Sequence, residues 1–161
     1  MEKIFFTPGP AQLYPTVQKH LLEALNLNLG SISHRGKQFQ GIFAETTANL
    51  ISLLGIPDGF NIYFTGSATE IWEKSLSSCA GKSSFHFVNG SFSKKYFEFS
   101  KELGLAAYKA EAPMGEGFDI SKIEIASEVE MICCTQNETS TGVQMPVADI
   151  HALKDKYSDK L

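Results

Sequence analysis

The stretch that decides the fold is Phe60–Ala80, which reads FNIYFTGSATEIWEKSLSSCA. Its first part, Phe60–Thr65, alternates large apolar residues with others and is rich in aromatics, which predicts a β-strand. Small and hydroxylated residues follow in Gly66–Thr69 and predict a tight turn. From Ala68 onward, apolar side chains recur at helical spacing, which predicts a helix with one packed face. Strand, small-residue turn and helix in this order are typical of an α/β fold.

The same arrangement predicts a binding site for an anion such as phosphate. The first turn of a helix has backbone N–H groups without internal partners, and the helix dipole favours negative charge there. Ser67 and Thr69 add hydroxyl donors, and the small side chains of the turn allow a phosphate to come close. An ordinary turn capped by Ser67 is the alternative that this stretch leaves open. The turn matches neither GxGxxG nor a P-loop, so no nucleotide motif is present in it.

Composition is that of a globular protein and excludes several classes of function. The 161 residues are 43% apolar and 20% charged, with a net charge of −4, which suits one domain with a sizeable core. Scattered basic residues indicate no nucleic-acid surface, and no apolar run approaches the roughly 20 residues that span a bilayer. Pro8 and Pro10 interrupt the N-terminus too early for a signal peptide. Cys79, Cys133 and Cys134 fit neither a disulfide framework nor a zinc site, which favours reduced thiols in a cytoplasmic protein.

The rest of the chain predicts alternating helices and strands. Residues 1–15 are expected to form an extended arm, because prolines restrict their own backbone and that of the preceding residue. Helices are expected at about 15–26, 38–54, 91–103, 119–126 and 147–157, and further strands at 84–88, 105–110 and 129–135. This alternation predicts an α/β fold, with a mainly parallel sheet and helices on both faces. Another strand is expected after the last helix, so we interpret residues 16–161 as the incomplete part of a longer domain.

Ligands of parallel α/β sheets bind beyond the carboxyl ends of the strands, which makes the loops there candidate sites. In Asn89–Ser93, Phe92 offers a ring for stacking on a planar ligand, although a core contact is the plainer interpretation of its helical spacing. The loop Thr135–Gly142 is rich in hydrogen-bonding side chains. It is either a solvated turn or a site whose Thr hydroxyl donates to a ring oxygen.

A second kind of candidate is the pair His34 and Arg35, in a loop before a helix. Arginine offers a fork of donors for carboxylate or phosphate, and histidine can add another donor. A surface arginine paired with a nearby acid is the alternative. The remaining histidines are interpreted as structural, and the sequence indicates no Ser/His/Asp set, carboxylate pair or metal cluster.

Five short motifs occur in the order seen in class V pyridoxal-phosphate-dependent aminotransferases. They are FTPGPA at 6–11, SHRGKQF at 33–39, TGSATE at 65–70, NGSF at 89–92 and QNET at 136–139. Each motif alone is weak, whereas all five at fitting distances over nearly the whole chain resemble this family specifically. The resemblance implies the N-terminal part of the large domain of a PLP-transferase of fold type I.

The resemblance also implies roles for single residues. Ser67, Ala68 and Thr69 would hold the phosphate of pyridoxal 5'-phosphate at the start of a helix. Phe92 would stack on the pyridine ring, where relatives acting on O-phosphoserine have Trp. Thr139 would donate a hydrogen bond to the phenolic oxygen of the cofactor.

Substrate binding and catalysis are implied in the same way. His34 and Arg35 would bind the substrate phosphate and reach into the partner subunit's site, since family members are two-fold dimers with shared active sites. The Gly9–Pro10 arm would line the substrate entrance. The Schiff-base lysine and the Asp that pairs with the ring nitrogen are expected downstream of Thr139. No lysine in the chain follows a matching motif, so no catalytic residue is assigned here and the chain alone is expected to be inactive.

The function implied for a longer parent enzyme is transamination of small amino acids and keto acids in the cytoplasm. The opening arm favours O-phosphoserine with 2-oxoglutarate, which in the biosynthetic direction is 3-phosphohydroxypyruvate with glutamate, a step of serine biosynthesis. Two alternatives stay open. One is a class V aminotransferase for alanine or serine with glyoxylate or pyruvate, and the other is a non-catalytic module that binds a phosphorylated ligand. Neither nucleic acid nor membrane is expected as a partner.

Overall fold

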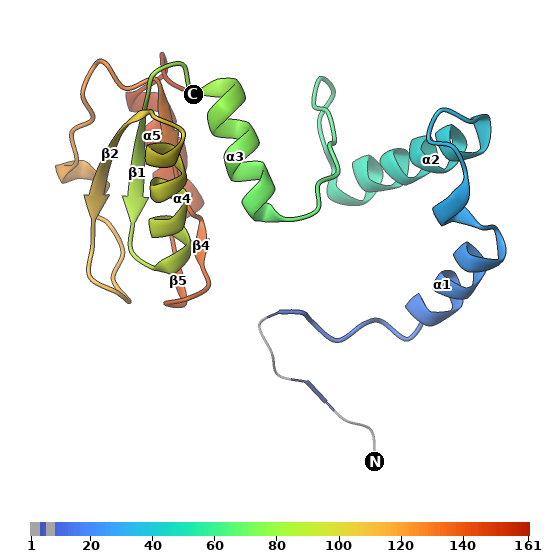
Figure 1. Cartoon of the computed structure of the whole chain (residues 1–161). Coiled ribbons are helices and arrows are strands. Elements are labelled where there is room, and N and C mark those ends of the chain that lie inside the picture. The colour runs from blue at the N-terminus through green and yellow to red at the C-terminus, as the bar shows by residue number, and fades with distance from the viewer. Residues whose placement is uncertain (1–3, 6–8) are drawn as a thin grey trace. The chain divides into compact units, whose positions relative to one another are not determined.

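The computed structural model describes residues 4–5 and 9–161, so part of the motif at 6–11 lies outside the described residues. The chain divides into two compact units, one up to Phe64 and one of Thr65–Leu161 (Figure 1). This division does not test the predicted boundary between an arm of residues 1–15 and a domain of residues 16–161, which stays a prediction. No helix in the described part of the chain is long and apolar enough to cross a membrane.

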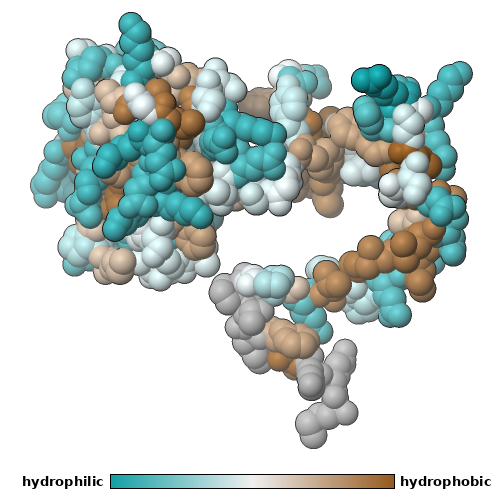
Figure 2. Space-filling view, viewed as in Figure 1, coloured by the Kyte–Doolittle hydropathy of each residue, from teal (hydrophilic) through white to brown (hydrophobic). Residues whose placement is uncertain are grey.

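The first unit confirms the two helices predicted for it. Helix α1 covers Val17–Asn26, a single 3-10 turn η1 covers Leu29–Ser31, and α2 covers Lys37–Leu54. Gly55 ends α2 with a φ of 61°, a left-handed conformation that glycine adopts without strain. Apolar side chains of α1 are exposed, among them Leu21 at 55% and Leu25 at 70%, and they form part of the brown band in Figure 2.

The strand predicted at Phe60–Thr65 is wrong, because this segment pairs with no strand among the described residues. Tyr63 is 81% exposed, and Phe64 instead places its ring edge-on against Phe43, with the centroids 5.4 Å apart. Alternating apolar residues predict which side of a strand is buried, but a strand also needs a neighbouring backbone to accept its hydrogen bonds.

The second unit contains the predicted parallel sheet. Its central strand β1 (Ser83–Val88) pairs in parallel with β2 (Ala106–Glu111) and β3 (Met131–Cys133), in the order β2-β1-β3. β3 is shorter than the strand predicted at 129–135. Beyond β3, the Leu161 N–H donates to the Glu130 carbonyl at 3.0 Å and the Ile132 N–H donates to the Leu161 carbonyl at 2.9 Å.

Helices cover both faces of this sheet, as predicted. They are α3 (Ala68–Cys79), α4 (Ser91–Glu102) and α5 (Val147–Lys156). On one face of β1, Phe85 and Phe87 share a core cluster with Leu153 of α5 and with Tyr157, the residue that follows this helix. On the other face, His86 meets the Tyr96 ring of α4, with the centroids 5.1 Å apart. Figure 1 shows α4 in front of the sheet and α5 behind it.

Two other expectations need correction. The helix predicted at 119–126 is only a 3-10 turn, η2 (Ile120–Lys122), because the chain then continues extended and buries Ile125, whose N–H donates to the Tyr157 hydroxyl at 3.0 Å. The segment after the strand predicted at 129–135, which includes the predicted loop Thr135–Gly142, contains a small antiparallel hairpin of β4 (Asn137–Glu138) and β5 (Val143–Gln144). A φ of 70° at Gly142 allows this tight reversal.

Acid is expected to destabilise the fold through His86. The side chain is 1% exposed, and burial lowers its pKa to about 4. The unfolded imidazole titrates near ~6.5, so its stabilising contribution is complete above that pH and is lost as the pH falls toward the folded pKa. The loss amounts to about 3 kcal/mol, measurable by urea unfolding at about pH 7 and about pH 4.

His86→Gln removes this titration, so the variant is expected to lose less stability than the native protein over the same pH interval. His151→Gln, at an exposed position of α5, serves as the control and keeps the native pH dependence. An equal pH dependence in the native protein and in His86→Gln would contradict the account.

Candidate functional site

The start of α3 leaves backbone donors open to a ligand. Ser67 is the extended N-cap residue, and its hydroxyl oxygen accepts the Glu70 N–H at 3.2 Å. Within the described residues, no group accepts a hydrogen bond from the N–H groups of Ala68 and Thr69, which belong to the first turn. The hydroxyl of Ser67 keeps its own proton for donation. The turn is therefore capped by Ser67 and still able to bind an anion.

A carboxylate at the edge of this turn is neutralised locally. Glu70 accepts the Gly66 N–H at 2.7 Å and pairs with the Lys74 ammonium at 2.5 Å. The bonds from Lys74 and Gly66 lower the pKa of Glu70, which keeps it ionised. Because Lys74 balances its charge, the open N–H groups of α3 are available to a ligand anion.

Trp72 joins the start of α3 to the start of α4. Its indole ring stacks on Tyr96, with centroids 5.4 Å apart, and meets the Phe92 ring at 6.4 Å with an interplanar angle of 65°. Phe92 remains 44% exposed, so one part of its ring packs against Trp72 while another part is available to a ligand. The structure thus brings Phe92 close to the helix that carries Ser67, Ala68 and Thr69.

Glu138 connects the hairpin to the start of α4. Its carboxylate accepts the Ser93 N–H at 2.7 Å, the Phe92 N–H at 3.4 Å and the Ser140 hydroxyl at 2.7 Å. Burial alone would raise the pKa of Glu138, but hydrogen bonds from Ser140 and Ser93 outweigh it and lower the pKa overall. Thr139 follows directly and is exposed, so its backbone adjoins the residue that holds the start of α4.

Sequence reasoning missed this role of Glu138, which it treated only as part of the motif QNET. One signal was available in the sequence. The residue before α4 is Gly90, which has no side chain to cap the helix, so another residue must satisfy the first N–H groups. Glu138 does so from a place 45 positions along the chain from Ser93, and local patterns do not reveal such a contact.

His34 and Arg35 belong to the unit up to Phe64, in the turn before α2. The Arg35 N–H donates to the Ser33 hydroxyl at 3.2 Å, and the Arg35 carbonyl accepts from the Gln40 side chain at 3.3 Å. Both side chains are exposed, and no acid pairs with the Arg35 guanidinium among the described residues. His34 and Arg35 therefore belong to a different unit from the other candidate residues, which lie in Thr65–Leu161.

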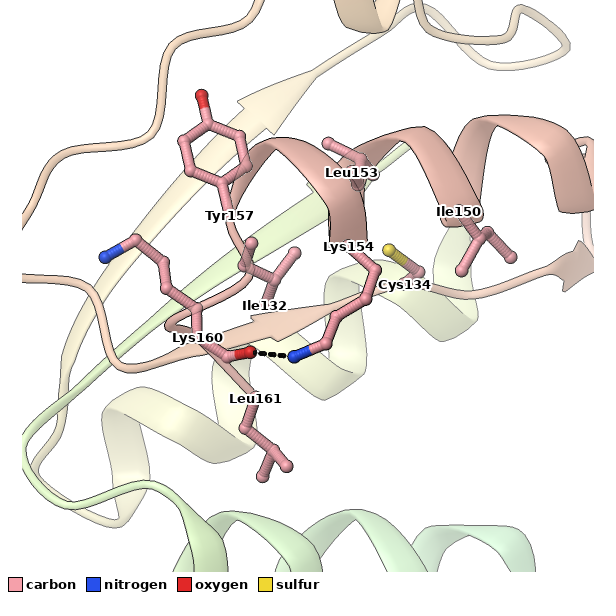
Figure 3. A pocket seen from close by; sticks show the side chains of 8 residues that line it. All are labelled: Ile132, Cys134, Ile150, Leu153, Lys154, Tyr157, Lys160 and Leu161. Atoms are coloured by element: carbon pink, nitrogen blue, oxygen red, sulfur yellow. Dashed lines mark hydrogen bonds between the residues drawn. The ribbon is translucent and has the colours of Figure 1, made fainter.

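An apolar pocket lies between α5 and the edge strand β3 of the sheet (Figure 3). It is lined by Ile132, Cys134, Ile150, Leu153, Lys154, Tyr157, Lys160 and Leu161. The two ammonium groups are held by backbone, since Lys154 donates to the Lys160 carbonyl at 2.7 Å and Lys160 donates to the Val129 carbonyl at 2.7 Å. With its lysines engaged in this way and its other walls mostly apolar, the pocket offers little chemistry, and we do not assign the site to it.

Comparisons with known proteins agree with the motifs. No family model matches the chain. The curated phosphoserine aminotransferase of Rhodococcus opacus is 28% identical over 144 residues, which make up 89% of this chain and 38% of that protein. A crystal structure of a phosphoserine aminotransferase from Cytophaga hutchinsonii is 50% identical with a TM-score of 0.94, over 99% of this chain and 44% of that one. An alanine–glyoxylate aminotransferase from Nostoc sp. shares the fold, with 22% identity and a TM-score of 0.75 over 96% of this chain and 40% of that one.

These likenesses confirm the class that the motifs indicate: the chain resembles the N-terminal part of the class V pyridoxal-phosphate-dependent aminotransferases. Within that class, its named relatives include phosphoserine aminotransferases at 28% and 50% identity. The chain spans between 38% and 44% of the length of these relatives.

Gly90→Ala is expected to destabilise the protein by about 2 kcal/mol, because an added methyl group must displace a buried side chain. A Cβ at Gly90 would lie 2.4 Å from Glu138 Cδ and 2.6 Å from the Ser140 hydroxyl. Gly117→Ala is the matched control, since a Cβ there meets no atom within 4 Å. Urea unfolding of both variants measures the difference, and equal stabilities would show that Gly90 has room for a side chain.

Proposed function

We propose that this chain supplies the cofactor-binding part of a pyridoxal-phosphate-dependent aminotransferase. The observation that carries the proposal is the open helix start at Ala68 and Thr69, in the same unit as the half-exposed ring of Phe92 and the hydroxyl of Thr139. The order of the five motifs and the 50% identity to the Cytophaga hutchinsonii enzyme support it.

The residues present fit the cofactor in chemical type. The N–H groups of Ala68 and Thr69, with the hydroxyls of Ser67 and Thr69, would hold its phosphate dianion. Phe92 would stack on the pyridine ring, and Thr139 would donate to the phenolic oxygen. When bound, pyridoxal phosphate supplies the electron sink that transamination needs, and the chain's own residues bind and orient it.

The substrate pair we propose for the whole enzyme is O-phosphoserine and 2-oxoglutarate, in cytoplasmic serine biosynthesis. The exposed Arg35 guanidinium, which has no acidic partner among the described residues, suits a phosphate or carboxylate group, and His34 adds a donor. Transamination between alanine and glyoxylate is the second candidate, because an alanine–glyoxylate aminotransferase shares the fold. We further propose that the anchoring lysine lies outside these residues, so the chain alone does not transaminate.

A homodimer with shared active sites is part of the same proposal. The exposed leucines of α1 offer apolar surface that association would bury, and His34 and Arg35 would then act in the site of the partner subunit. Sedimentation of the whole enzyme tests this part independently of its catalytic activity.

Pyridoxamine phosphate is a suitable probe of the proposed site, because its amine cannot bond covalently to a lysine. The native chain is expected to bind it saturably, with inorganic phosphate competing. Thr69→Val removes one hydroxyl donor at nearly constant shape and is expected to weaken binding about fivefold, as for one lost hydrogen bond of ~1 kcal/mol. Ser78→Ala, at an exposed position of α3, is the control. Absence of saturable binding to the native chain would refute the proposed cofactor site.

A chimeric enzyme tests the substrate. The matched 44% of the Cytophaga hutchinsonii phosphoserine aminotransferase is replaced by this chain, and the product is assayed with O-phosphoserine and with alanine. Arg35→Ala in this chimera is expected to raise the KM for O-phosphoserine by roughly ten- to a hundredfold, because a charge-assisted contact is lost. Lys19→Ala, an exposed cation of α1, is the control and leaves KM unchanged. Unchanged kinetics in Arg35→Ala would refute the role of this residue.

A further inference from the structure

We infer that Glu138 is a positioning residue of the cofactor site: its buried carboxylate joins hairpin β4–β5 to the start of α4 and so fixes the backbone at Thr139 relative to the backbone at Phe92. This inference rests on the proposed function, because it concerns how these two residues would hold a pyridine ring. It adds to that function a residue that does not itself touch the cofactor.

The contacts of Glu138 tie two distant segments together. The carboxylate is part of a side chain that is 1% exposed, and it accepts N–H groups from Phe92 and Ser93 in α4. It also accepts the N–H of Ser140 at 3.2 Å and the Ser140 hydroxyl at 2.7 Å within its own hairpin. The Ser140 hydroxyl oxygen in turn accepts the Ser91 N–H at 2.8 Å, so the hairpin contacts every residue of Ser91–Ser93.

The start of α4 has no equivalent cap of its own. Its N-cap is Gly90, and the Ser93 hydroxyl is already used as acceptor for the N–H groups of Gly90 and Asn89, both at 3.1 Å. A Cβ at Gly90 would overlap Glu138, so the glycine makes room for the carboxylate. A negative charge at this helix end is further stabilised by the helix dipole.

Two features of this arrangement bear directly on the site. The N–H of Phe92 is itself one of the groups that the carboxylate holds, so the backbone that carries the stacking ring is fixed by Glu138. Thr139 is the next residue along the chain from Glu138, so its backbone is fixed by the same side chain. A single carboxylate thus controls the spacing of two groups 47 positions apart, Phe92 and Thr139, which would otherwise depend on separate loops.

Glu138→Gln tests the inference with little change of shape. The amide offers one oxygen and an NH₂ group that faces other donors, so the bonds to α4 and to Ser140 cannot all be kept. We expect the dissociation constant for pyridoxamine phosphate to rise about tenfold. We also expect the induced circular dichroism of the bound ring, measured at saturation, to fall, because the ring loses its fixed orientation.

Glu130→Gln is the matched control. The Glu130 carboxylate accepts the Lys82 N–H at 2.7 Å just before β1, at the opposite end of that strand from Asn89, so it satisfies a backbone donor far from the proposed site. This variant is expected to keep the native affinity and the native dichroism. Ser140→Ala removes one hydrogen-bond partner of Glu138 and keeps the negative charge. Its affinity and dichroism are expected to lie between those of the native chain and those of Glu138→Gln, and it replaces Glu138→Gln in the test if that variant does not fold.

The outcomes separate this inference from the function on which it rests. Native affinity and native dichroism in Glu138→Gln, or in Ser140→Ala if the former does not fold, would overturn the positioning role and leave the cofactor site intact. If Glu130→Gln lost as much affinity as Glu138→Gln, and both variants kept the native dichroism at saturation, Glu138 would contribute only to stability. Absence of binding to the native chain would overturn the proposed function and this inference with it.

Discussion

The first N–H groups of two neighbouring helices, which have no acceptor within their own helix, are the constraint on which the proposed site depends. A helix start presents donors that must be satisfied by a cap, by water or by a ligand. In α4 the chain satisfies them internally, with the carboxylate of Glu138. In α3 the hydroxyl of Ser67 accepts only the Glu70 N–H, and within the described residues the N–H groups of Ala68 and Thr69 have no acceptor. The start of α4 is therefore held by a carboxylate of the chain itself, whereas the start of α3 is the place where we propose that a ligand anion binds.

Packing keeps these two helix starts together. Trp72 is the only tryptophan of the chain, and it contacts Phe92, Tyr96 and Phe99 of α4. Aromatic pairs of this kind contribute about 1 kcal/mol each beyond the area that they bury. Below them, α4 covers one face of β1 and α5 covers the other, so the site rests on a sheet with a well-packed core. A rigid base of this kind suits a site whose donors must keep fixed positions.

The sequence predicted what is local and missed what depends on distant contacts. The helices α3, α4 and α5 and the parallel strands of Thr65–Leu161 follow from periodicity, and the turn at Ser67 follows from its small residues, whereas the helix predicted at 119–126 did not form. The strand predicted at Phe60–Thr65 was wrong because alternating apolar residues do not show whether a partner strand is present. The strands β4 and β5 were missed because two residues each are too few for a recognisable sequence pattern. Phe92 was a candidate from its place after a predicted strand and Thr139 from the resemblance, and both roles stay predictions. The contacts of Glu138 became visible only when its partners in α4 were known.

The most direct test of the account is the response of single backbone amides to pyridoxamine phosphate. In a ¹H–¹⁵N correlation spectrum of the native chain, the account predicts that saturation shifts the resonances of Ala68 and Thr69 strongly, together with those around Phe92 and Thr139. The amides that line the apolar pocket, such as those of Ile132 and Tyr157, should stay unchanged. Constant resonances at Ala68 and Thr69, with shifts confined to that pocket, would contradict the account.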